Sequence, residues 1–434
     1  MAENRVKIAI VGGGIAGLAL AVGLIKKPHL DVHVYEAVSA YKDVGAGLAL
    51  HLNAIKAMTL IGAEVREAYF DKALTMGDEN QEMVTEVILG QGPHQGQLVA
   101  ELGRAKGRKT VSRADLLDGY LALIPREQIS FGKRLVKITE KSSDKHVVHL
   151  LFQDNTKAAV DCLLSADGIH SVTRNYLLGA DHPAASPKNH DGWQIYRTMV
   201  STEEARKQIN PKWTTGVPIL LGPRGHINCI PLNKNTRLSA GVAVRGAVSP
   251  VLENGNGVFK PLDPALYADY SEEAQQIVRM VARDTSASWA AGDHDHAPFY
   301  TRNHVAMFGD AAHAALPFAG NGAAQALEDA AVLDALFAQV RNPNQITRAL
   351  AAFDEVRRPR SQAVVDLARK FGRVYAYAED GMHEDPERMR AFFAEMAAFT
   401  NEFDVKGQNE VALRMFEKMD GVDGTNGVHG DLKN

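Results

Sequence analysis

The chain of 434 residues lacks several features that mark particular classes of protein. It has only two cysteines, Cys162 and Cys229, which lie far apart and have no C-x-x-C spacing. This argues against a disulfide framework or a cysteine zinc site, and it favours a reducing, cytoplasmic location. No group of His, Asp and Glu residues has metal-ligand spacing either, so we expect no bound metal.

An excess of charge of one sign is also missing, because 48 Lys and Arg residues face 52 Asp and Glu residues. We therefore expect no nucleic-acid partner. Two short basic clusters, residues 106–109 and 357–360, are expected to be solvated surface or helix ends. The uncharged residues 8–25 imitate a membrane span, but three consecutive glycines fit a strand, turn and helix better. No membrane span is expected.

What the chain does have is a glycine turn near its N-terminus, between an apolar run and a helical pattern. Gly12, Gly14 and Gly17 follow the spacing G-x-G-x-x-G, and Glu36 ends the next apolar run. In this pattern the first glycine permits a tight turn, the second lets backbone approach a pyrophosphate, and the third lets the helix pack on the strand. Glu36 can accept hydrogen bonds from ribose hydroxyls. The pattern predicts a dinucleotide site and leaves FAD and NAD(P) open.

A second motif, residues 165–174, directly follows another apolar strand. Its Asp167-Gly168 pair, with Ser171 and Arg174 on the next helix, can place a carboxylate and backbone donors against a cofactor. The same letters also fit an ordinary turn with a helix cap, and the residues alone leave both interpretations open.

A third motif spans residues 307–329, from a short apolar strand to a long helix. Asp310 ends the strand and can bind polyol hydroxyls, while Pro317 fixes the approach to the helix. The N-terminus of that helix could stabilise negative charge on a ring system. We expect a structural role for His313 at the domain junction. The residues that open the helix are Gly320, Asn321 and Gly322.

In their order these motifs resemble the single-component (group A) flavoprotein aromatic hydroxylases. The chain looks most like the salicylate hydroxylase branch. The resemblance adds the run Arg113-Ala-Asp-Leu to the three motifs and covers about residues 5–370. It implies FAD as the cofactor, NAD(P)H as a transient co-substrate, and O₂ and a small aromatic molecule as the other reactants.

The resemblance also implies roles for individual residues. The glycine turn would hold the FAD pyrophosphate, Glu36 the adenosine ribose, and Arg113 the pyrophosphate and ribityl side. Asp167 would belong to the motif that serves both FAD and NAD(P)H. Asp310 would bind the ribityl or pyrophosphate, and the third-motif glycines would lie against the isoalloxazine. The implied cofactor-binding residues are Gly12, Gly14, Ala16, Gly17, Glu36, Gly47, Arg113, Asp167, Asp310, Pro317, Gly320, Asn321 and Gly322.

Two residues are candidates for the catalytic site. The pair Tyr196-Arg197 matches a similar pair in salicylate hydroxylase-like proteins, and a cation there would lower the pKa of a substrate phenol and orient it. A surface cross-strand ion pair is the alternative. His226 is the second candidate, as a base or hydrogen-bond partner, against a satisfied turn histidine. Phe318 and Ile230 depart from the His and the aromatic residue common in relatives, which removes polar reach near the expected cavity.

The resulting fold is α/β: a Rossmann-like FAD-binding domain, an interleaved and mostly antiparallel β-sheet substrate domain, and a helical C-terminus. The FAD-binding parts are predicted at residues 1–74, 111–185 and 298–370. The substrate sheet is predicted at residues 75–110 and 186–297. Residues 371–434 are expected to be helical with a flexible tail.

The function that follows is an FAD-dependent, NAD(P)H-consuming monooxygenase. It would hydroxylate a phenolic or salicylate-like aromatic through a flavin C4a-hydroperoxide, as a monomer or homodimer. The alternatives are a flavin epoxidase or heteroaromatic oxygenase on the same fold, a nicotinamide dehydrogenase, and a non-catalytic FAD-fold binding protein.

Overall fold

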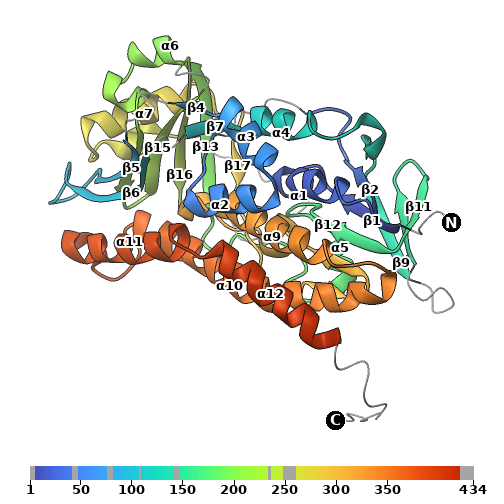
Figure 1. The fold of residues 1–434 in the computed structure, drawn as a ribbon. Coiled ribbons are helices and arrows are strands. Elements are labelled where there is room, and N and C mark those ends of the chain that lie inside the picture. The colour runs from blue at the N-terminus through green and yellow to red at the C-terminus, as the bar shows by residue number, and fades with distance from the viewer. Residues whose placement is uncertain are drawn as a thin grey trace.

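The computed structural model describes residues 5–41, 47–75, 82–106, 109–140, 147–232, 236–247 and 261–420 (Figure 1). The tail expected to be flexible, residues 421–434, and the middle of the first basic cluster lie outside the described residues. Two large sheets lie side by side, and a long helix passes below both (Figure 1).

The first sheet has six strands in the order β18-β19-β12-β1-β2-β8. All its neighbours are parallel except β18 and β19. Its central strands are apolar runs because helices cover both faces of a parallel sheet. The Rossmann-like prediction is therefore confirmed. The strands are β1 (Val6–Val11), β2 (Leu30–Tyr35), β8 (Ile129–Ser130), β12 (Cys162–Ser165), β18 (Thr301–Arg302) and β19 (Val305–Met307).

The glycine turn joins β1 to helix α1 (Ile15–Ile25). Gly12 has φ +103°, and a Cβ atom at Gly17 would stand 1.9 Å from the Gly12 carbonyl oxygen. Both positions therefore require glycine for the reasons the spacing predicts. The uncharged residues 8–25 form this strand, turn and helix. Within the described part of the chain, no helix is long and apolar enough to cross a bilayer.

Further helices surround the first sheet and carry parts of the site. Ser112 caps α4 by accepting a hydrogen bond from the Asp115 backbone N–H at 3.0 Å. His51 precedes α2, and Asn53 is buried inside this helix. These helices are α2 (Leu52–Ile61), α3 (Ala63–Lys72), α4 (Arg113–Leu121), α5 (Val172–Leu178), α8 (Asp310–His313) and α9 (Gly322–Phe337).

The second sheet has seven strands in the order β17-β13-β16-β15-β14-β5-β6. Only the pair β14 and β5 is parallel, so the expectation of a mostly antiparallel sheet is confirmed. One face packs on α6 (Thr202–Arg206) and α7 (Glu272–Ala282). The strands are β5 (Glu82–Leu89), β6 (Leu98–Lys106), β13 (Gln194–Ser201), β14 (Val217–Gly222), β15 (Gly225–Leu232), β16 (Arg237–Val244) and β17 (Trp289–Ala290).

Two small antiparallel sheets complete the strands, in the orders β11-β10-β9 and β3-β7-β4. Strand β3 (Gly47–Ala49) matters here because it runs between the two large sheets toward the site. The others are β4 (Leu74–Thr75), β7 (Lys109–Ser112), β9 (Leu135–Glu140), β10 (Val148–Phe152) and β11 (Lys157–Val160). Because the strands of 82–106 and 194–244 share one sheet, the interleaved domain boundaries stay a reasonable prediction.

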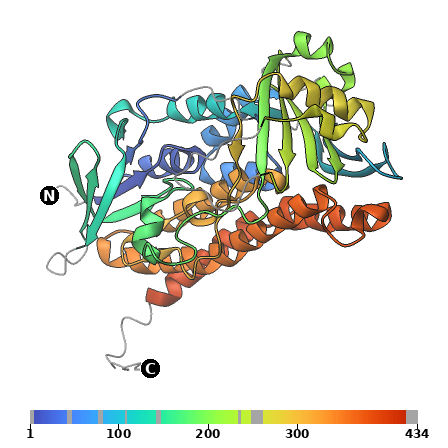
Figure 2. The ribbon, with the colours of Figure 1, turned by 180° about the vertical axis from the view of Figure 1, so that it is seen from behind.

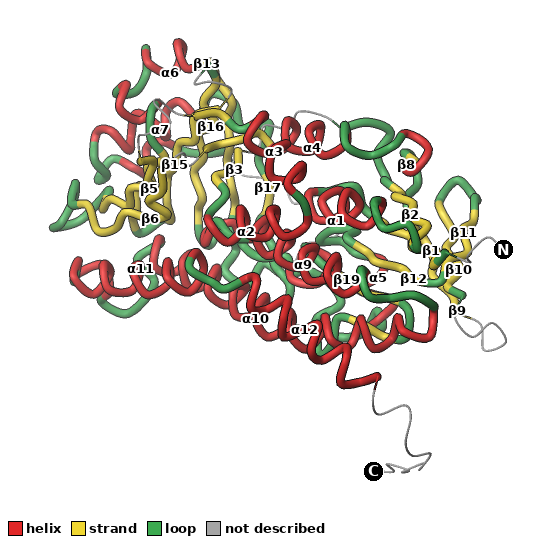
Figure 3. The backbone as a smooth tube through the Cα atoms, viewed as in Figure 1, coloured by secondary structure: helices red, strands yellow, loops and turns green. Residues whose placement is uncertain are grey.

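The C-terminal helices are α10 (Ile346–Tyr375), α11 (Pro386–Asn401) and α12 (Val405–Asp420). Front and rear views both show α10 passing below the two large sheets (Figures 1 and 2). Helix α11 lies beside the strands of the second sheet (Figure 3). Its apolar side chains Met389 and Phe393 are fully buried, whereas Phe399 is 41% exposed.

A buried ionic network joins α10 to α9. Arg357 donates to Asp329 Oδ1 at 2.7 Å and to Glu328 Oε2 at 2.6 Å, and all three side chains are inaccessible to solvent. Arg360 reaches Glu328 Oε2 at 3.3 Å. The expectation that residues 357–360 form solvated surface or a helix end is therefore wrong. The basic cluster lies within α10, and two of its arginines point into the protein to neutralise carboxylates.

The network also fixes the third motif. Asp329 Oδ2 accepts from the Gly309 backbone N–H at 2.8 Å and lies 2.6 Å from His313 Nε2. Burial by itself raises the pKa of Asp329, but His313 and Arg357 bring it below its usual value. His313 therefore has the structural position that we expect for it.

Replacing Arg357 with Leu should lower the free energy of unfolding by about 3–5 kcal/mol, because the buried Asp329 would lose its arginine and the buried Glu328 would keep only Arg360. Urea denaturation measures the loss. As a control, Arg279→Leu on α7 removes a half-exposed partner of Glu272 and should cost less than about 1 kcal/mol. Equal losses in the two variants would contradict the dominance of the buried network.

Candidate active site

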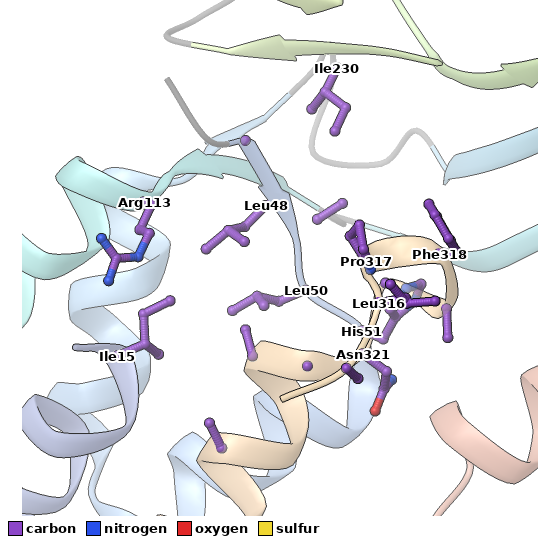
Figure 4. Close-up of a pocket in the computed structure, with 18 of the residues that line it drawn as sticks. Ile15, Leu48, Leu50, His51, Arg113, Ile230, Leu316, Pro317, Phe318 and Asn321 are labelled. Carbon is purple, nitrogen blue, oxygen red and sulfur yellow. The ribbon is translucent and has the colours of Figure 1, made fainter. Parts of the chain in front are cut away.

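A cavity of ≈ 430 Å³ lies where α1, β3, the third motif and the inner face of the second sheet meet (Figure 4). In the close-up, Arg113 and Ile15 stand at one side, and Pro317 and Phe318 at the other. The structure thus brings together segments from the N-terminus, the middle and the last third of the chain. Predicted residues that line the cavity are Gly14, Ala16, Gly47, Arg113, Arg197, His226, Asp310, Pro317, Gly320, Asn321 and Gly322.

One end of the cavity suits a pyrophosphate. Gly14 precedes α1 and no side chain of the described residues caps this helix, so the backbone N–H groups of its first turn are open toward the cavity. Arg113 stands beside the turn, with its Nη2 atom 3.8 Å from where a Cβ of Gly14 would lie. Within the described ranges Arg113 makes no ion pair or hydrogen bond, which leaves its guanidinium for an anion.

The third motif forms the other wall of this region. Asp310 is exposed to the cavity at the start of α8, and no described residue donates a hydrogen bond to its carboxylate. Gly320 has φ +60°, and only backbone therefore stands at this position of the wall. Polyol hydroxyls of a cofactor can donate to Asp310, as the motif predicts.

Asn321 supplies a direct test of whether a flavin fits. The residue is buried, and its Oδ1 accepts from Asn53 at 3.2 Å and from Gln325 at 2.9 Å. Its Nδ2, however, has no acceptor among the described residues, although Asn321 lines the cavity. A donor left open beside a glycine-lined wall fits the acceptor edge of an isoalloxazine. The residues present therefore fit FAD.

Four of the predicted cofactor residues do not line the cavity. Gly12 and Gly17 shape the turn. Glu36, buried at the end of β2, accepts from the Gly13 and Val38 backbone N–H groups at 2.6 and 2.8 Å. Its oxygens thus hold the glycine turn, and their remaining lone pairs are available to a ribose.

The carboxylate of Asp167 faces its own loop. It accepts a hydrogen bond from the Ser171 hydroxyl and another from the Thr173 backbone N–H at 3.1 Å. Burial raises the pKa of Asp167 above its usual value. Its neighbour Gly168 lines the cavity instead. The contact between this motif and a cofactor stays a prediction, and in this geometry backbone rather than the carboxylate would make it.

The face of the second sheet closes the cavity and presents Arg197. Alternate residues of a strand point to opposite faces, so Tyr196 packs with α7 while Arg197 lines the cavity. The guanidinium lies 4.8 Å from the centre of the Trp289 ring. No carboxylate among the described residues pairs with it, so the surface ion pair considered above is not found there. Burial lowers the pKa of Arg197, which remains a cation.

His226 lies on β15 and lines the same cavity. Burial lowers its pKa to about 3, so it is neutral at physiological pH and a weak base. Its Nδ1 has no hydrogen-bond partner within the described part of the chain. The geometry therefore favours a hydrogen-bonding role over the role of a base, and it differs from a satisfied turn histidine.

Phe318 and Ile230, which replace a His and an aromatic residue common in relatives, both line the cavity, as the sequence predicts. Phe318 packs against the Trp193 ring at 4.4 Å and the His226 ring at 5.1 Å. A Cβ atom at Gly372 of α10 would come within 2.6 Å of the Phe318 ring. The Phe318 wall is therefore rigid and apolar.

The sequence does not predict that Tyr375 lies at the cavity. This last residue of α10 lines the cavity, and its hydroxyl is enclosed with no partner among the described residues. In the sequence, Tyr375 is only one residue of an apolar helical pattern, and that pattern does not indicate a cavity.

A two-sheet α/β fold with a glycine turn, an open anion site and an apolar cavity beside it defines a flavin-dependent enzyme class. Comparisons with known proteins support this assignment to a flavin-dependent class. A family model described as FAD binding domain matches residues 5–368. The chain is 34% identical over 421 residues to a 6-methylsalicylate 1-monooxygenase of Aspergillus terreus, covering 95% of this chain and 93% of the relative.

Two further comparisons support this assignment. A salicylate hydroxylase of Pseudomonas putida is 30% identical over 400 residues, covering 86% of this chain and 88% of that protein. A solved salicylate hydroxylase substrate complex has a TM-score of 0.80 at 27% identity, covering 95% of this chain and 98% of that one.

The chain belongs to this family of FAD-binding proteins, and its identification as a salicylate hydroxylase-like FAD-dependent monooxygenase is confirmed. FAD is its cofactor, and the comparisons favour an aromatic hydroxylase over a nicotinamide dehydrogenase or a non-catalytic binding protein.

Replacing Arg113 with Ala should raise the dissociation constant of FAD about 10- to 100-fold, because a charged hydrogen-bond donor to the pyrophosphate is lost. Titration of the apoprotein with FAD, followed by flavin fluorescence, measures the change. Arg126→Ala, an exposed arginine away from the cavity, is the control. Unchanged affinity in Arg113→Ala would remove this residue from the cofactor site.

The stability of the protein should depend on pH through His226. Between its folded pKa of about 3 and the value of 6.5 for an unperturbed histidine, the unfolded chain holds one more proton at this position. The free energy of unfolding therefore falls as pH is lowered from 7 to 5. In His226→Phe this fall should be shallower, by up to about 1.4 kcal/mol per pH unit. Urea denaturation at several pH values measures this fall, and an equal fall in the wild type and in His226→Phe would contradict the prediction.

Proposed function

We propose that the protein hydroxylates a phenolic, salicylate-like aromatic acid whose negative charge is bound by Arg197. One observation carries this proposal: Arg197 lines the cavity, and no carboxylate among the described residues neutralises it. A cation with no acidic partner beside an apolar cavity favours an anionic ligand. Relatives named for salicylate and 6-methylsalicylate support the same substrate class.

Bound FAD, reduced by NAD(P)H, would activate O₂ so that one oxygen atom enters the ring and the other leaves as water. The chain's own residues would do the rest. Arg197 would hold the substrate anion and favour phenolate over phenol, because a nearby positive charge stabilises the deprotonated form. The apolar side chains of Val217, Ile219 and Ile230 would exclude water from the ring.

Phe318 and Ile230 narrow the substrate further. Both present hydrocarbon to the cavity, and Phe318 is held in place by Trp193 and Gly372. An alkyl substituent on the ring would bury apolar surface against them, whereas a further charged group would lose its hydration there. We therefore propose an alkyl-substituted hydroxybenzoate as the best substrate within the class.

We also propose that the enzyme acts in the cytoplasm as a monomer or homodimer. Both cysteines are buried and unpaired, which suits a reducing compartment. Mass measurement of the purified holoenzyme in solution would decide between the two assembly states.

A substrate screen tests the function. Salicylate, methylated salicylates, phenolic aldehydes and heteroaromatics would each be mixed with holoenzyme, NADH or NADPH, and O₂. The proposal expects that one hydroxybenzoate stimulates NAD(P)H oxidation and is recovered as hydroxylated product in matching amount. Turnover of heteroaromatics alone would support the heteroaromatic oxygenase instead, and stimulation without product would mean release of peroxide.

Replacing Arg197 with Gln should raise the dissociation constant of the aromatic acid about 10- to 100-fold while bound FAD stays unchanged, because only the charge is removed. Binding is measured by the change in flavin absorbance. Arg197→Lys should recover part of the affinity, since it keeps the charge without the planar fork.

The matched control is Arg245→Gln, just after the end of β16 in the same sheet, where Arg245 pairs with Asp191. That variant should bind the acid as the wild type does. If Arg197→Gln also bound it normally, Arg197 would not be the anion site.

A further inference from the structure

The cavity contains a second polar region, formed by His226 on β15 and Tyr375 at the end of α10. The centres of the two rings are 5.0 Å apart and the rings are inclined by 60°. Apolar rings flank them, Phe318 at 5.1 Å from His226 and Phe371 at 5.6 Å from Tyr375. Neither the cofactor contacts nor the anion site at Arg197 uses this pair.

Both side chains carry polar atoms that have no partner in the part of the chain that the structure describes. The Nδ1 atom of His226 and the hydroxyl oxygen of Tyr375 are enclosed, and neither makes a hydrogen bond within the described residues. An unpaired buried polar group costs about 1–3 kcal/mol, and such groups in native proteins call for an explanation. Two of them on neighbouring rings at a cavity wall indicate that a ligand completes their hydrogen bonds.

The region is uncharged. Burial lowers the pKa of His226 to about 3 and raises the pKa of Tyr375 above its usual value, so the imidazole is neutral and the phenol keeps its proton. A neutral imidazole offers one donor and one acceptor, and a tyrosine hydroxyl can do both. Such a pair suits a hydroxyl or carbonyl oxygen, whereas a carboxylate is bound better by the cation at Arg197.

The strand register gives the separation of the two polar regions. Arg197 pairs with Gly241 on β16, and Gly241 pairs with Asn228 on β15, two residues from His226. With strands about 4.8 Å apart and a rise of about 3.4 Å per residue, the Cα atoms of Arg197 and His226 are about 12 Å apart. Gly241 adds no side chain between them. Two side chains reaching inward from these positions leave room for one substituted ring.

We propose that His226 and Tyr375 bind an uncharged oxygen substituent of the aromatic substrate, a hydroxyl or carbonyl group, on the side of the ring away from the group that Arg197 holds. The inference rests on the proposed function, because it takes an aromatic acid as the substrate. With both sides of the ring held, the pair determines which ring carbon faces the flavin. His226 and Tyr375 are thus specificity-determining residues.

The test compares hydroxyl with methyl, which has a similar size but makes no hydrogen bond. The FAD-loaded protein is titrated with benzoate, the three monohydroxybenzoates and the three methylbenzoates, and binding is followed by flavin absorbance. In the wild type, one hydroxybenzoate isomer should bind about five- to tenfold more tightly than its methyl counterpart. Tyr375→Phe, His226→Phe and the smaller His226→Asn should each reduce this preference to about twofold or less, with benzoate binding kept.

Tyr267→Phe is the matched control. Tyr267 also has an enclosed hydroxyl without a partner among the described residues, but it packs on the opposite face of the same sheet with α7. This variant should keep the full hydroxyl preference. Tyr375→Phe should also melt at the wild-type temperature or above it, because the mutation removes only an unpaired buried group.

The outcomes separate the two proposals. If benzoate binds in an Arg197-dependent way and no hydroxyl preference exists, or the preference survives in all three cavity variants, the inference is wrong and the proposed function stands. If no aromatic acid binds the wild-type holoenzyme, the proposed function fails and this inference fails with it. A preference lost equally in Tyr267→Phe would also overturn the assignment to the cavity pair.

Discussion

The cofactor side of the molecule depends on one buried cation. Arg357 of α10 neutralises Glu328 and Asp329 of α9, and Asp329 in turn holds the Gly309 backbone and His313. The loop that carries Asp310 is therefore positioned by an arginine far away in the sequence. Burial of such ions is costly unless they are paired, so loss of any one member of the network would strongly destabilise the protein. A flavin site on this wall inherits that rigidity.

The substrate side depends on sheet geometry instead. Because alternate residues of a strand point to opposite faces, Arg197 faces the cavity and Tyr196 faces the core on the other side of the sheet. The pairing of Arg197, Gly241 and Asn228 across three strands sets the width of the sheet face that forms the roof of the cavity. A glycine at the middle position keeps that roof thin, because a Cβ there would stand 2.8 Å from Asn228 Oδ1. Charge and space are thus arranged by register rather than by loops.

How much the sequence predicts follows from the range of each interaction. The glycine turn is a local feature of the backbone, so its spacing alone predicts that Gly12 and Gly17 must lack side chains. The motifs also predict most of the cofactor wall. Burial of Arg357 could not be predicted, since its carboxylates lie on another helix and a run of arginines usually means surface. The position of Tyr375 at the cavity could not be predicted either, because a helical apolar pattern does not show where a cavity interrupts the core.

Helix α10 connects these two sides. Arg357 and Tyr375 lie on the same helix about five turns, or about 27 Å, apart, which places them on the same side of the rod. A single residue inserted between them would rotate one relative to the other by about 100° and move it about 1.5 Å along the axis. The number of residues in this segment is therefore as constrained as their identity, and evolution of new substrate preferences in this scaffold must exchange side chains on the helix while its length stays fixed.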